Sequence, residues 1–357
     1  MIEPKQNVKK ITRLVDTEER KGFIRLDRNE RVTPFPPKMM AEFLSRISAE
    51  DLMRYPIAEP LYHKMAAWLG IERDGLLLTY GSDGAIRSVF EVYVNPGDRI
   101  VMPYPTYAMY TVYANLFQAN ACKLAYDRNL TLTVEHFCRA ITPETRLVIL
   151  PNPNSPTGTV FSQAEMEMIL EKAASVEALT LVDEAYYYFH DQTMLGYVKD
   201  YENLLVTRTF SKAAGLAGLR IGYVVGQPSL IQYLMRVKPT YEINGVGQRL
   251  TEYMIEHEEF LWQSAHKVKE GQAFLKRKFE SKGLKVFECP TNFMVVRLPS
   301  GFDRSELVRR LAEARFLIKG TFRDQCLADC IRITSGPVTI MSEFWQVFEK
   351  IYDELAS

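Results

Sequence analysis

From about residue 76, short apolar runs alternate with longer amphipathic ones, and turn residues separate them. The apolar runs, typical of buried β-strands, are 76–80, 99–103, 121–126, 146–151, 179–189 and 203–210. The runs with helical periodicity are 85–94, 106–119 and 164–174. The last of them is preceded by Ser162 and Glu165 at capping-box spacing. Strands that are apolar on both faces and alternate with helices predict an α/β fold, with a mainly parallel sheet flanked by helices.

The character of the chain changes after about residue 240. Residues 247–282 predict one long amphipathic helix, and then 285–298, 305–318 and 330–336 read as strand, helix and strand. The predicted boundaries are an N-terminal arm without a core of its own at 1–28, a large domain at 29–240 and a smaller α/β domain at 241–357.

The overall charge excludes several classes of partner. Lysine plus arginine equals aspartate plus glutamate at 44 each among 357 residues, so we expect neither a nucleic-acid surface nor binding to anionic membranes. No apolar stretch reaches membrane-spanning length and the first residues are charged. The five cysteines are scattered, which favours free thiols over a metal site and predicts a cytoplasmic protein.

Candidate chemistry lies in the loops that follow the predicted strands, because ligands of open α/β sheets bind beyond the carboxyl ends of the strands. Gly81–Gly84 opens a helix, where free backbone N–H groups can hold phosphate or can simply form a cap. The loop 151–158 holds three prolines and is either a ligand-contacting loop or a rigid turn. Asp183 ends an apolar strand, so its carboxylate should meet a cationic partner.

The loop after residue 208 carries the most specific combination. Lys212 stands at a strand end between hydroxyl residues, where desolvation would lower its pKa and make it a nucleophile able to form a Schiff base. Thr209, Ser211 and Arg220 could together bind a dianionic phosphate. A lysine for an imine, an acid for a pyridinium nitrogen and a phosphate site are what pyridoxal phosphate requires of a protein.

These motifs carry a family resemblance. With Asp183–Tyr186, Ser211–Ala213 and Leu216–Arg220 at this separation, the chain resembles the fold-type I pyridoxal-phosphate enzymes from about Leu26 to its end. Within them it is similar to the histidinol-phosphate aminotransferase family and its relative threonine-phosphate decarboxylase.

The resemblance implies roles for individual residues. Lys212 would carry pyridoxal 5'-phosphate and shuttle the substrate proton, Asp183 would keep the pyridine nitrogen protonated, and Tyr186 would donate to the phenolic oxygen. The cofactor site would be a homodimeric one that includes Tyr55 of the partner subunit. The other implied cofactor contacts are Ser82, Asp83, Tyr107, Asn154, Thr209, Ser211 and Arg220.

On the substrate side, the resemblance assigns Arg332 to the substrate carboxylate and Asn29 to the segment that lies over the substrate. This half departs from the family pattern. Lys319 stands where the family commonly has an arginine, with Arg323 nearby. Ser155 stands where the family has asparagine, and we favour Asn154 for the cofactor contact because its amide reaches further. The N-terminal segment reads Asn-Glu-Arg instead of Asn-Glu-Asn, and the arm offers Arg20, Lys21 and Arg25 in place of a tyrosine motif.

The predicted function is therefore transamination dependent on pyridoxal phosphate, between an amino donor and a keto acceptor, with glutamate and 2-oxoglutarate as the default pair. The altered substrate half suggests a small amino compound, plausibly phosphorylated, other than histidinol phosphate. The alternative is decarboxylation of a phosphorylated amino acid in the same pocket. A regulator that only binds the cofactor is not favoured, because only a short segment precedes the match and the chain as a whole has no net charge.

Overall fold

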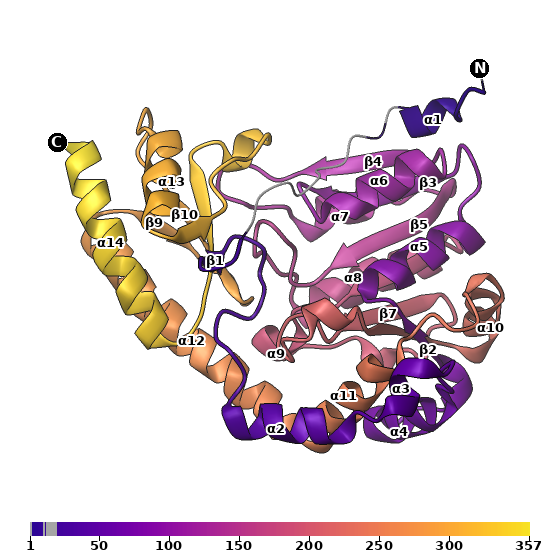
Figure 1. Ribbon diagram of the computed structural model, residues 1–357. Coiled ribbons are helices and arrows are strands. Elements are labelled where there is room, and N and C mark those ends of the chain that lie inside the picture. Colours follow the sequence, from indigo (N-terminus) through magenta and orange to yellow (C-terminus); the bar gives the residue numbers. More distant parts are fainter. Residues whose placement is uncertain (1, 10, 12–19) are drawn as a thin grey trace.

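The computed structural model describes residues 2–9, 11 and 20–357, and its central element is a seven-stranded sheet (Figure 1). The strand order is β2 (Leu76–Thr79), β8 (Gly222–Gly226), β7 (Leu204–Thr209), β6 (Leu179–Asp183), β5 (Thr145–Pro151), β3 (Arg99–Tyr104) and β4 (Asn120–Ala125). Only β8 runs antiparallel to its neighbours, and the remaining pairs are parallel. The prediction of a mainly parallel sheet is confirmed, although the pattern did not indicate β8.

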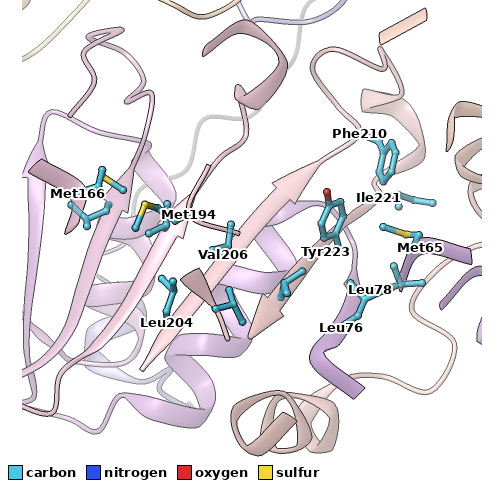
Figure 2. Packing of buried hydrophobic residues seen from close by; sticks show 14 of the residues in the cluster. Met65, Leu76, Leu78, Met166, Met194, Leu204, Val206, Phe210, Ile221 and Tyr223 are labelled. Atoms are coloured by element: carbon cyan, nitrogen blue, oxygen red, sulfur yellow. The ribbon is translucent and has the colours of Figure 1, made fainter. Parts of the chain in front are cut away.

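The sheet is buried on both faces because alternate strand residues enter two different cores. Leu76 and Leu204 belong to one cluster, shown in Figure 2, whereas Leu77 and Leu205 belong to the other. The first face packs on α4 (Glu59–Leu69), α7 (Val134–Ala140), α8 (Gln163–Ala174) and α11 (Gly245–Glu256). The second face packs on α5 (Ser82–Tyr93), α6 (Ala108–Leu116) and α10 (Pro228–Val237). This two-sided burial explains why the strands read as continuous apolar runs.

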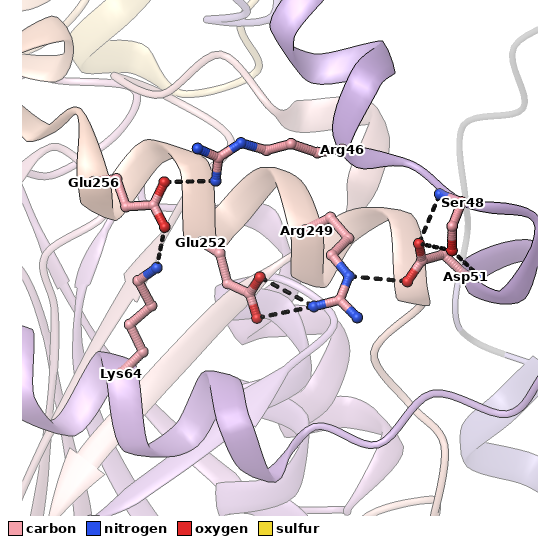
Figure 3. Close-up of polar contacts among 7 residues, drawn as sticks. All are labelled: Arg46, Ser48, Asp51, Lys64, Arg249, Glu252 and Glu256. Atoms are coloured by element: carbon pink, nitrogen blue, oxygen red, sulfur yellow. Dashed lines mark hydrogen bonds and ion pairs between the residues drawn. The ribbon is translucent and has the colours of Figure 1, made fainter.

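Ion pairs fix the helices at the N-terminal side, α2 (Pro37–Arg46), α3 (Ala49–Met53) and α4, against α11 (Figure 3). Glu256 binds Arg46 (2.5 Å) and Lys64. Arg249 Nε donates to Asp51 Oδ1 (2.9 Å). Exposed pairs contribute little stability each, but together they join α2, α3 and α4 to α11.

The predicted helix 247–282 is two helices, because the chain breaks at His257 between α11 and α12 (Glu258–Ser281). The predicted strand 285–298 is also two elements, β9 (Lys285–Phe287) and β10 (Phe293–Arg297), which form an antiparallel sheet with β12 (Cys330–Thr334). The predicted helix 305–318 ends early. It comprises α13 (Arg304–Glu313) followed by β11 (Phe316–Ile318). The last helix is α14 (Val338–Ala356).

The segment expected to lack a core ends in a short strand whose last residue is buried. Strand β1 (Ile24–Leu26) pairs in parallel with β11, and Leu26 is fully buried in the core around α12 and α14. Helix α1 (Gln6–Lys9) lies near α6, where Asn7 Nδ2 donates to the backbone oxygen of Leu116 (2.6 Å). The domain boundaries stay predictions, and part of the predicted arm, 12–19, lies outside the described residues. None of the helices described is long and apolar enough to cross a membrane.

Candidate active site

The sheet topology gathers the predicted loops at one edge. Strands β6 and β7 are neighbours, and Asp183 at the end of β6 pairs with Thr207, two residues before Thr209 ends β7. Gly222, at the start of antiparallel β8, pairs with Thr209 on one side and with Thr79 on the other. The loop that follows β2 is thereby brought next to the loop that carries Lys212. This places residues from four chain segments around one site.

Hydroxyl groups and one arginine form a cradle at the start of α5. Thr209 Oγ1 donates to Ser211 Oγ (3.0 Å), and Arg220 Nη1 donates to the same Ser211 oxygen (3.4 Å). Gly81 caps α5 with a left-handed φ of 80°, and Arg220 Nη2 lies 2.9 Å from where a Cβ on Gly81 would stand. Ser82 begins the helix, so its backbone N–H is available to an anion. The cradle has the charge and donors that bind a phosphate dianion.

This cradle requires a glycine at the start of β8. A Cβ on Gly222 would stand 2.5 Å from the Gly81 carbonyl carbon, 2.6 Å from Ser82 N and 2.7 Å from the backbone oxygen of Arg208. All three atoms belong to backbone, which cannot rotate out of the way. The close approach explains the glycine of Arg220-Ile-Gly222 without reference to any ligand.

Asp183 is a buried carboxylate, 6% exposed, at the end of β6. Its Oδ2 accepts from Tyr110 Oη (2.5 Å) and its Oδ1 from the backbone N–H of Ala185 (3.0 Å). That second bond turns the chain, so the predicted strand 179–189 stops at Asp183 and α9 (Tyr187–His190) follows. Burial raises the pKa of Asp183 to about 6 despite these two hydrogen bonds and the charge of Lys212. Within the described part of the chain no cationic side chain pairs with it, so the carboxylate is placed to receive a cationic ligand.

Lys212 lies under the N-terminal segment. Its Nζ donates to the backbone oxygen of Asn29 (3.3 Å) and stands 5.7 Å from the centre of the Tyr186 ring. Asn29 Nδ2 donates to Tyr186 Oη (2.8 Å), and Asn29 N donates to Thr334 Oγ1 (2.9 Å). Asn29 is buried, and its φ of 59° lies in the left-handed region. Its backbone oxygen accepts from Lys212 and its side-chain amide donates to Tyr186. The structure thus brings together the predicted residues Lys212, Tyr186 and Asn29.

Tyr107 covers the same site from the start of α6. Its ring meets Tyr110 edge to face at 5.8 Å. Burial raises the pKa of the Tyr107 hydroxyl, Asp83 and Asp183 raise it further, and Arg220 lowers it. Tyr107 therefore lies within the electrostatic reach of both the cradle and the carboxylate, as a ring stacked on a ligand between them would require.

Asn154 lies in the loop after β5 with its amide engaged. Its Nδ2 donates to the Pro105 backbone oxygen (2.9 Å) and to Thr157 Oγ1 (2.7 Å), while its Oδ1 accepts from Thr106 (2.7 Å). Both amide hydrogens are used, so a contact with a cofactor would cost one of these bonds. Ser155 Oγ instead accepts from Arg332. The preference for Asn154 over Ser155 stays a prediction.

Two cationic side chains stand together at the other end of the site. Arg332 Nη2 donates to the backbone oxygen of Asp27 (2.7 Å), and its Nη1 donates to Ser155 Oγ (3.4 Å). Lys319 and Arg332 exchange backbone hydrogen bonds of 3.0 and 2.8 Å. Burial lowers the pKa of the Arg332 guanidinium, and burial together with the Arg332 charge lowers the pKa of the Lys319 ammonium. An anion bound between them would relieve both effects.

The remaining predicted residues lie further out. Arg323 is exposed in the loop after Lys319, near Tyr104, and no contact among the described residues joins it to Arg332. Arg20 pairs with Asp27, which places the end of the arm beside the site. Lys21 and Arg25 are exposed, and Arg25 lies 3.6 Å from Glu30. Tyr55 is 76% exposed and stacks on Tyr241 at 4.4 Å, away from its own chain's cradle.

With this geometry in place, the comparison with known families decides the assignment. Residues 22–346 match the family described as Aminotransferase class I and II. The chain belongs to this family. It is a pyridoxal-phosphate-dependent aminotransferase, as the motifs around Asp183 and Lys212 predicted.

Curated relatives of this aminotransferase are named histidinol-phosphate aminotransferase. One from Caldanaerobacter subterraneus is 30% identical over 313 residues, covering 87% of this chain and 88% of the relative. One from Burkholderia lata is 32% identical over 324 residues, covering 88% of each. The fold also matches a putative histidinol-phosphate aminotransferase from Erwinia carotovora atroseptica (TM-score 0.86, 24% identity, 96% of this chain and 99% of that one). It matches the Sinorhizobium meliloti enzyme in complex with pyridoxal-5'-phosphate as well (TM-score 0.85, 22% identity, 98% and 97%).

The residues of this aminotransferase fit its cofactor. The Thr209, Ser211 and Arg220 cradle suits the phosphate, and the buried Asp183 carboxylate suits a protonated ring nitrogen. Lys212 stands on the same sheet edge for the covalent link. When bound, pyridoxal phosphate supplies an electron sink that weakens a bond at the carbon carrying the substrate amino group.

Sequence reasoning missed several residues that build the aminotransferase site. Tyr110 binds Asp183, and the only signal was its place one helical turn after Tyr107. Arg208 Nε donates to Glu184 Oε2 (2.9 Å) in a buried pair directly behind Asp183. An arginine inside an apolar strand is itself a signal, because a buried cation needs a buried acid.

Proposed function

We propose that this aminotransferase transfers an amino group between glutamate/2-oxoglutarate and a small, phosphorylated amino compound other than histidinol phosphate. The observation that carries the proposal is the pair of half-buried cations, Arg332 on β12 and Lys319 directly after β11, which are neighbours across a backbone bridge. A planar guanidinium binds a carboxylate through two parallel hydrogen bonds, whereas an ammonium acts as a compact point charge. The two residues can therefore serve two different anionic groups of successive substrates.

Each of three residues, Lys212, Asp183 and Arg332, has its own role in the proposed reaction. Lys212 would hold the cofactor through its Nζ, and the same amine would carry the proton removed from the substrate carbon. Asp183 holds a proton on the ring nitrogen, and Tyr110 and the Ala185 N–H keep the carboxylate in place. Arg332 orients the substrate by its carboxylate, which selects the bond that breaks.

The substrate hypothesis rests on what differs from the related family. Lys319 lacks the fork that an arginine would offer to a phosphate. Arg20 reaches this end of the site through Asp27. Arg31, which stands in place of the second asparagine of the N-terminal segment, instead donates to Ser264 Oγ. The substitutions at Lys319 and in the arm change the contacts at the far end of the substrate, whereas among the proposed cofactor residues the departure is Ser155 in place of asparagine.

Steady-state kinetics with a panel of phosphorylated amino acids, amino alcohol phosphates and histidinol phosphate tests the proposal. We expect a phosphorylated amine other than histidinol phosphate to have the highest kcat/KM, and removal of its phosphate to raise KM. The highest kcat/KM for histidinol phosphate would refute the substrate hypothesis. Release of carbon dioxide without formation of a keto product would instead support the decarboxylase alternative, whose reaction the same pocket could host.

Lys212→Ala tests the catalytic assignment. The variant should fold normally, lose the visible absorbance of the lysine-bound cofactor and lose nearly all turnover, because both the covalent link and the proton carrier are removed. Lys199→Ala, which removes an exposed lysine, is the matched control and should keep both. Retention of absorbance and activity in Lys212→Ala would contradict the assignment.

We also propose a homodimer in which Tyr55 of the partner subunit completes the phosphate site. Apolar side chains are exposed around α3 and the segment after it, which is typical of an association surface. They are Leu44, Leu52, Met53, Tyr55, Ile57 and Tyr241. Mixing Tyr55→Ala with Lys212→Ala after dissociation should restore activity, because a mixed dimer regains one complete site. Two inactive variants that stay inactive when mixed, or a monomer in sedimentation, would contradict the shared site.

A cytoplasmic location is the last element of the proposal. All five cysteines are free in the structure, as a reducing compartment would allow. Cell fractionation with the tagged chain tests it, and recovery of the protein in a membrane or secreted fraction would contradict it.

A further inference from the structure

Besides the cradle, the structure has a cavity with Lys212 in its wall. Its volume is about 320 Å³, and it is enclosed by the segment 30–37, helices α9 and α12, and residues 335–337 before α14. Lys212 forms part of one wall, but Asp183, Tyr107 and Arg332 do not line it. The cavity, which we call the Arg31 cavity, is therefore distinct from the cofactor cradle and from the substrate arginine.

The cavity carries a cation without an acidic partner. The Arg31 guanidinium lies 5.0 Å from each of the Phe35 and Phe260 rings, donates through Nη1 to Ser264 Oγ (2.6 Å) and through Nε to the Thr33 backbone oxygen (3.0 Å). No described carboxylate pairs with it, and burial lowers its pKa. These contacts position the guanidinium and leave its Nη2 group for a ligand.

The charges around Arg31 favour an anion. Glu30 also lines the cavity, but its carboxylate faces Arg25 (3.6 Å) and Arg20 (4.0 Å). Lys267, exposed at the mouth, adds a second positive charge. The remaining walls are largely apolar, with the Phe35, Phe260, Phe189 and Val268 side chains among them.

Besides Glu30 Oε2, which faces Arg25, two buried polar atoms in the lining lack hydrogen-bond partners among the described residues. Asn292 is 3% exposed, and its Nδ2 donates to the backbone oxygen of Asn29 (2.9 Å), which fixes the amide so that Oδ1 is the free acceptor. Ser335 is 2% exposed, and its Oγ has no partner among the described residues. Buried polar groups are nearly always hydrogen-bonded in folded proteins, so this pair points to a ligand with a donor group.

We propose that the Arg31 cavity binds a small organic carboxylate that carries a hydroxyl group and an apolar body. The carboxylate binds Arg31 Nη2 and Lys267, the hydroxyl donates to Asn292 Oδ1 and accepts from Ser335 Oγ, and the apolar body packs on Phe35 and Phe260. This site is independent of the transamination proposed above. An occupant would contact Lys212 without competing for Arg332, which does not line the cavity.

Calorimetric titration of the cofactor-loaded enzyme tests the site with three probes of similar size. They are 2-hydroxy-3-phenylpropanoate, 3-phenylpropanoate, which lacks the hydroxyl, and 2-phenylethanol, which lacks the carboxylate. We expect the first to bind about tenfold more tightly than either of the others, because each of those leaves a buried polar group or a cation unpaired. Equal binding of all three, or no binding, would overturn the proposal.

Variants locate the bound probe. Arg31→Met and Lys267→Met should weaken 2-hydroxy-3-phenylpropanoate by about tenfold, since each loses a charged partner. Lys269→Met, on the same helix but outside the lining, should leave its affinity unchanged, as should Arg332→Met. Loss of binding in Arg332→Met with retention in Arg31→Met would place the probe in the substrate site and refute the proposal.

Ser335→Ala separates a binding role from a structural one, because it removes one small atom and leaves Arg31 packed as before. It should weaken 2-hydroxy-3-phenylpropanoate but not 3-phenylpropanoate, since only the first offers a partner to the Ser335 hydroxyl. Equal weakening of both probes would contradict the assigned contact.

Discussion

Asp183 should destabilise the cofactor-free protein at neutral pH, and Asp183→Asn should therefore stabilise it. Burial raises the pKa of this carboxyl from 3.8 to about 6. The difference corresponds to about 3 kcal/mol of folding free energy, lost when the buried group must ionise. Asparagine has the same shape and remains neutral. Its oxygen can still accept from the Ala185 N–H, and the Tyr110 hydroxyl can accept from its amide.

The sign of the pH dependence follows from which state holds the proton. Between about pH 4 and pH 6 the folded protein keeps the Asp183 proton that the unfolded chain has released, so wild-type stability falls as the pH rises through this window. Below it the carboxyl is protonated in both states and the variant gains nothing. Above it the gain reaches its full value, about 4 °C in Tm for a chain of 357 residues.

Urea or thermal unfolding of cofactor-free wild type and Asp183→Asn across this pH range measures the effect. The same variant should bind pyridoxal phosphate about a hundredfold more weakly. An ionised carboxylate attracts the protonated ring nitrogen and offsets the cost of about 3 kcal/mol, whereas a neutral amide does not. Asp200→Asn, at an exposed carboxylate, is the control and should change neither property. A cofactor-free Asp183→Asn that is less stable than wild type near neutral pH, or a gain that persists at pH 4, would refute the reasoning.

Two further substitutions test how the site is built. Gly222→Ala should lose about 1–3 kcal/mol in urea unfolding and weaken cofactor binding, since its Cβ meets backbone atoms, whereas Gly218→Ala, with open space around it, should be nearly neutral. Equal effects of the two would contradict the packing argument. Glu184→Gln should lose about 3–5 kcal/mol because it leaves the buried Arg208 charge unpaired, while Glu256→Gln on the surface should lose less than about 1 kcal/mol. A small loss at Glu184 would show that Arg208 finds another partner.

The cofactor half of the site could be predicted from the sequence because it is built from strand ends. Asp183 and Lys212 each follow an apolar run, and neighbouring parallel strands bring such ends to one edge. The predictions that failed concern where individual helices and strands end. The helix break at His257 falls within a continuous amphipathic pattern. Strand β6 ends at Asp183, where a hydrogen bond from the Ala185 N–H to the Asp183 side chain turns the chain. Periodicity cannot report either event.

The Arg31 cavity and the fold of the N-terminal segment depend on contacts between distant parts of the chain. Asn29 bonds Thr334, Asn292 and Tyr186 across 157 to 305 residues. No spacing rule links residues so far apart. Their hydrogen bonds became visible only when the strands β10 and β12 were placed next to the segment.

The substrate half is harder to predict for a related physical reason. Arg332 comes from β12, but its Nη2 donates to the backbone oxygen of Asp27, and Asp27 in turn binds Arg20. A substrate carboxylate that takes two hydrogen bonds from Arg332 must therefore compete with, or displace, the segment that covers the site. Substrate choice is thus coupled to how that segment is held, through a backbone atom that any residue type would supply. The sequence predicts Arg332 for the substrate carboxylate, but it gives no sign of this competition with the Asp27 backbone oxygen.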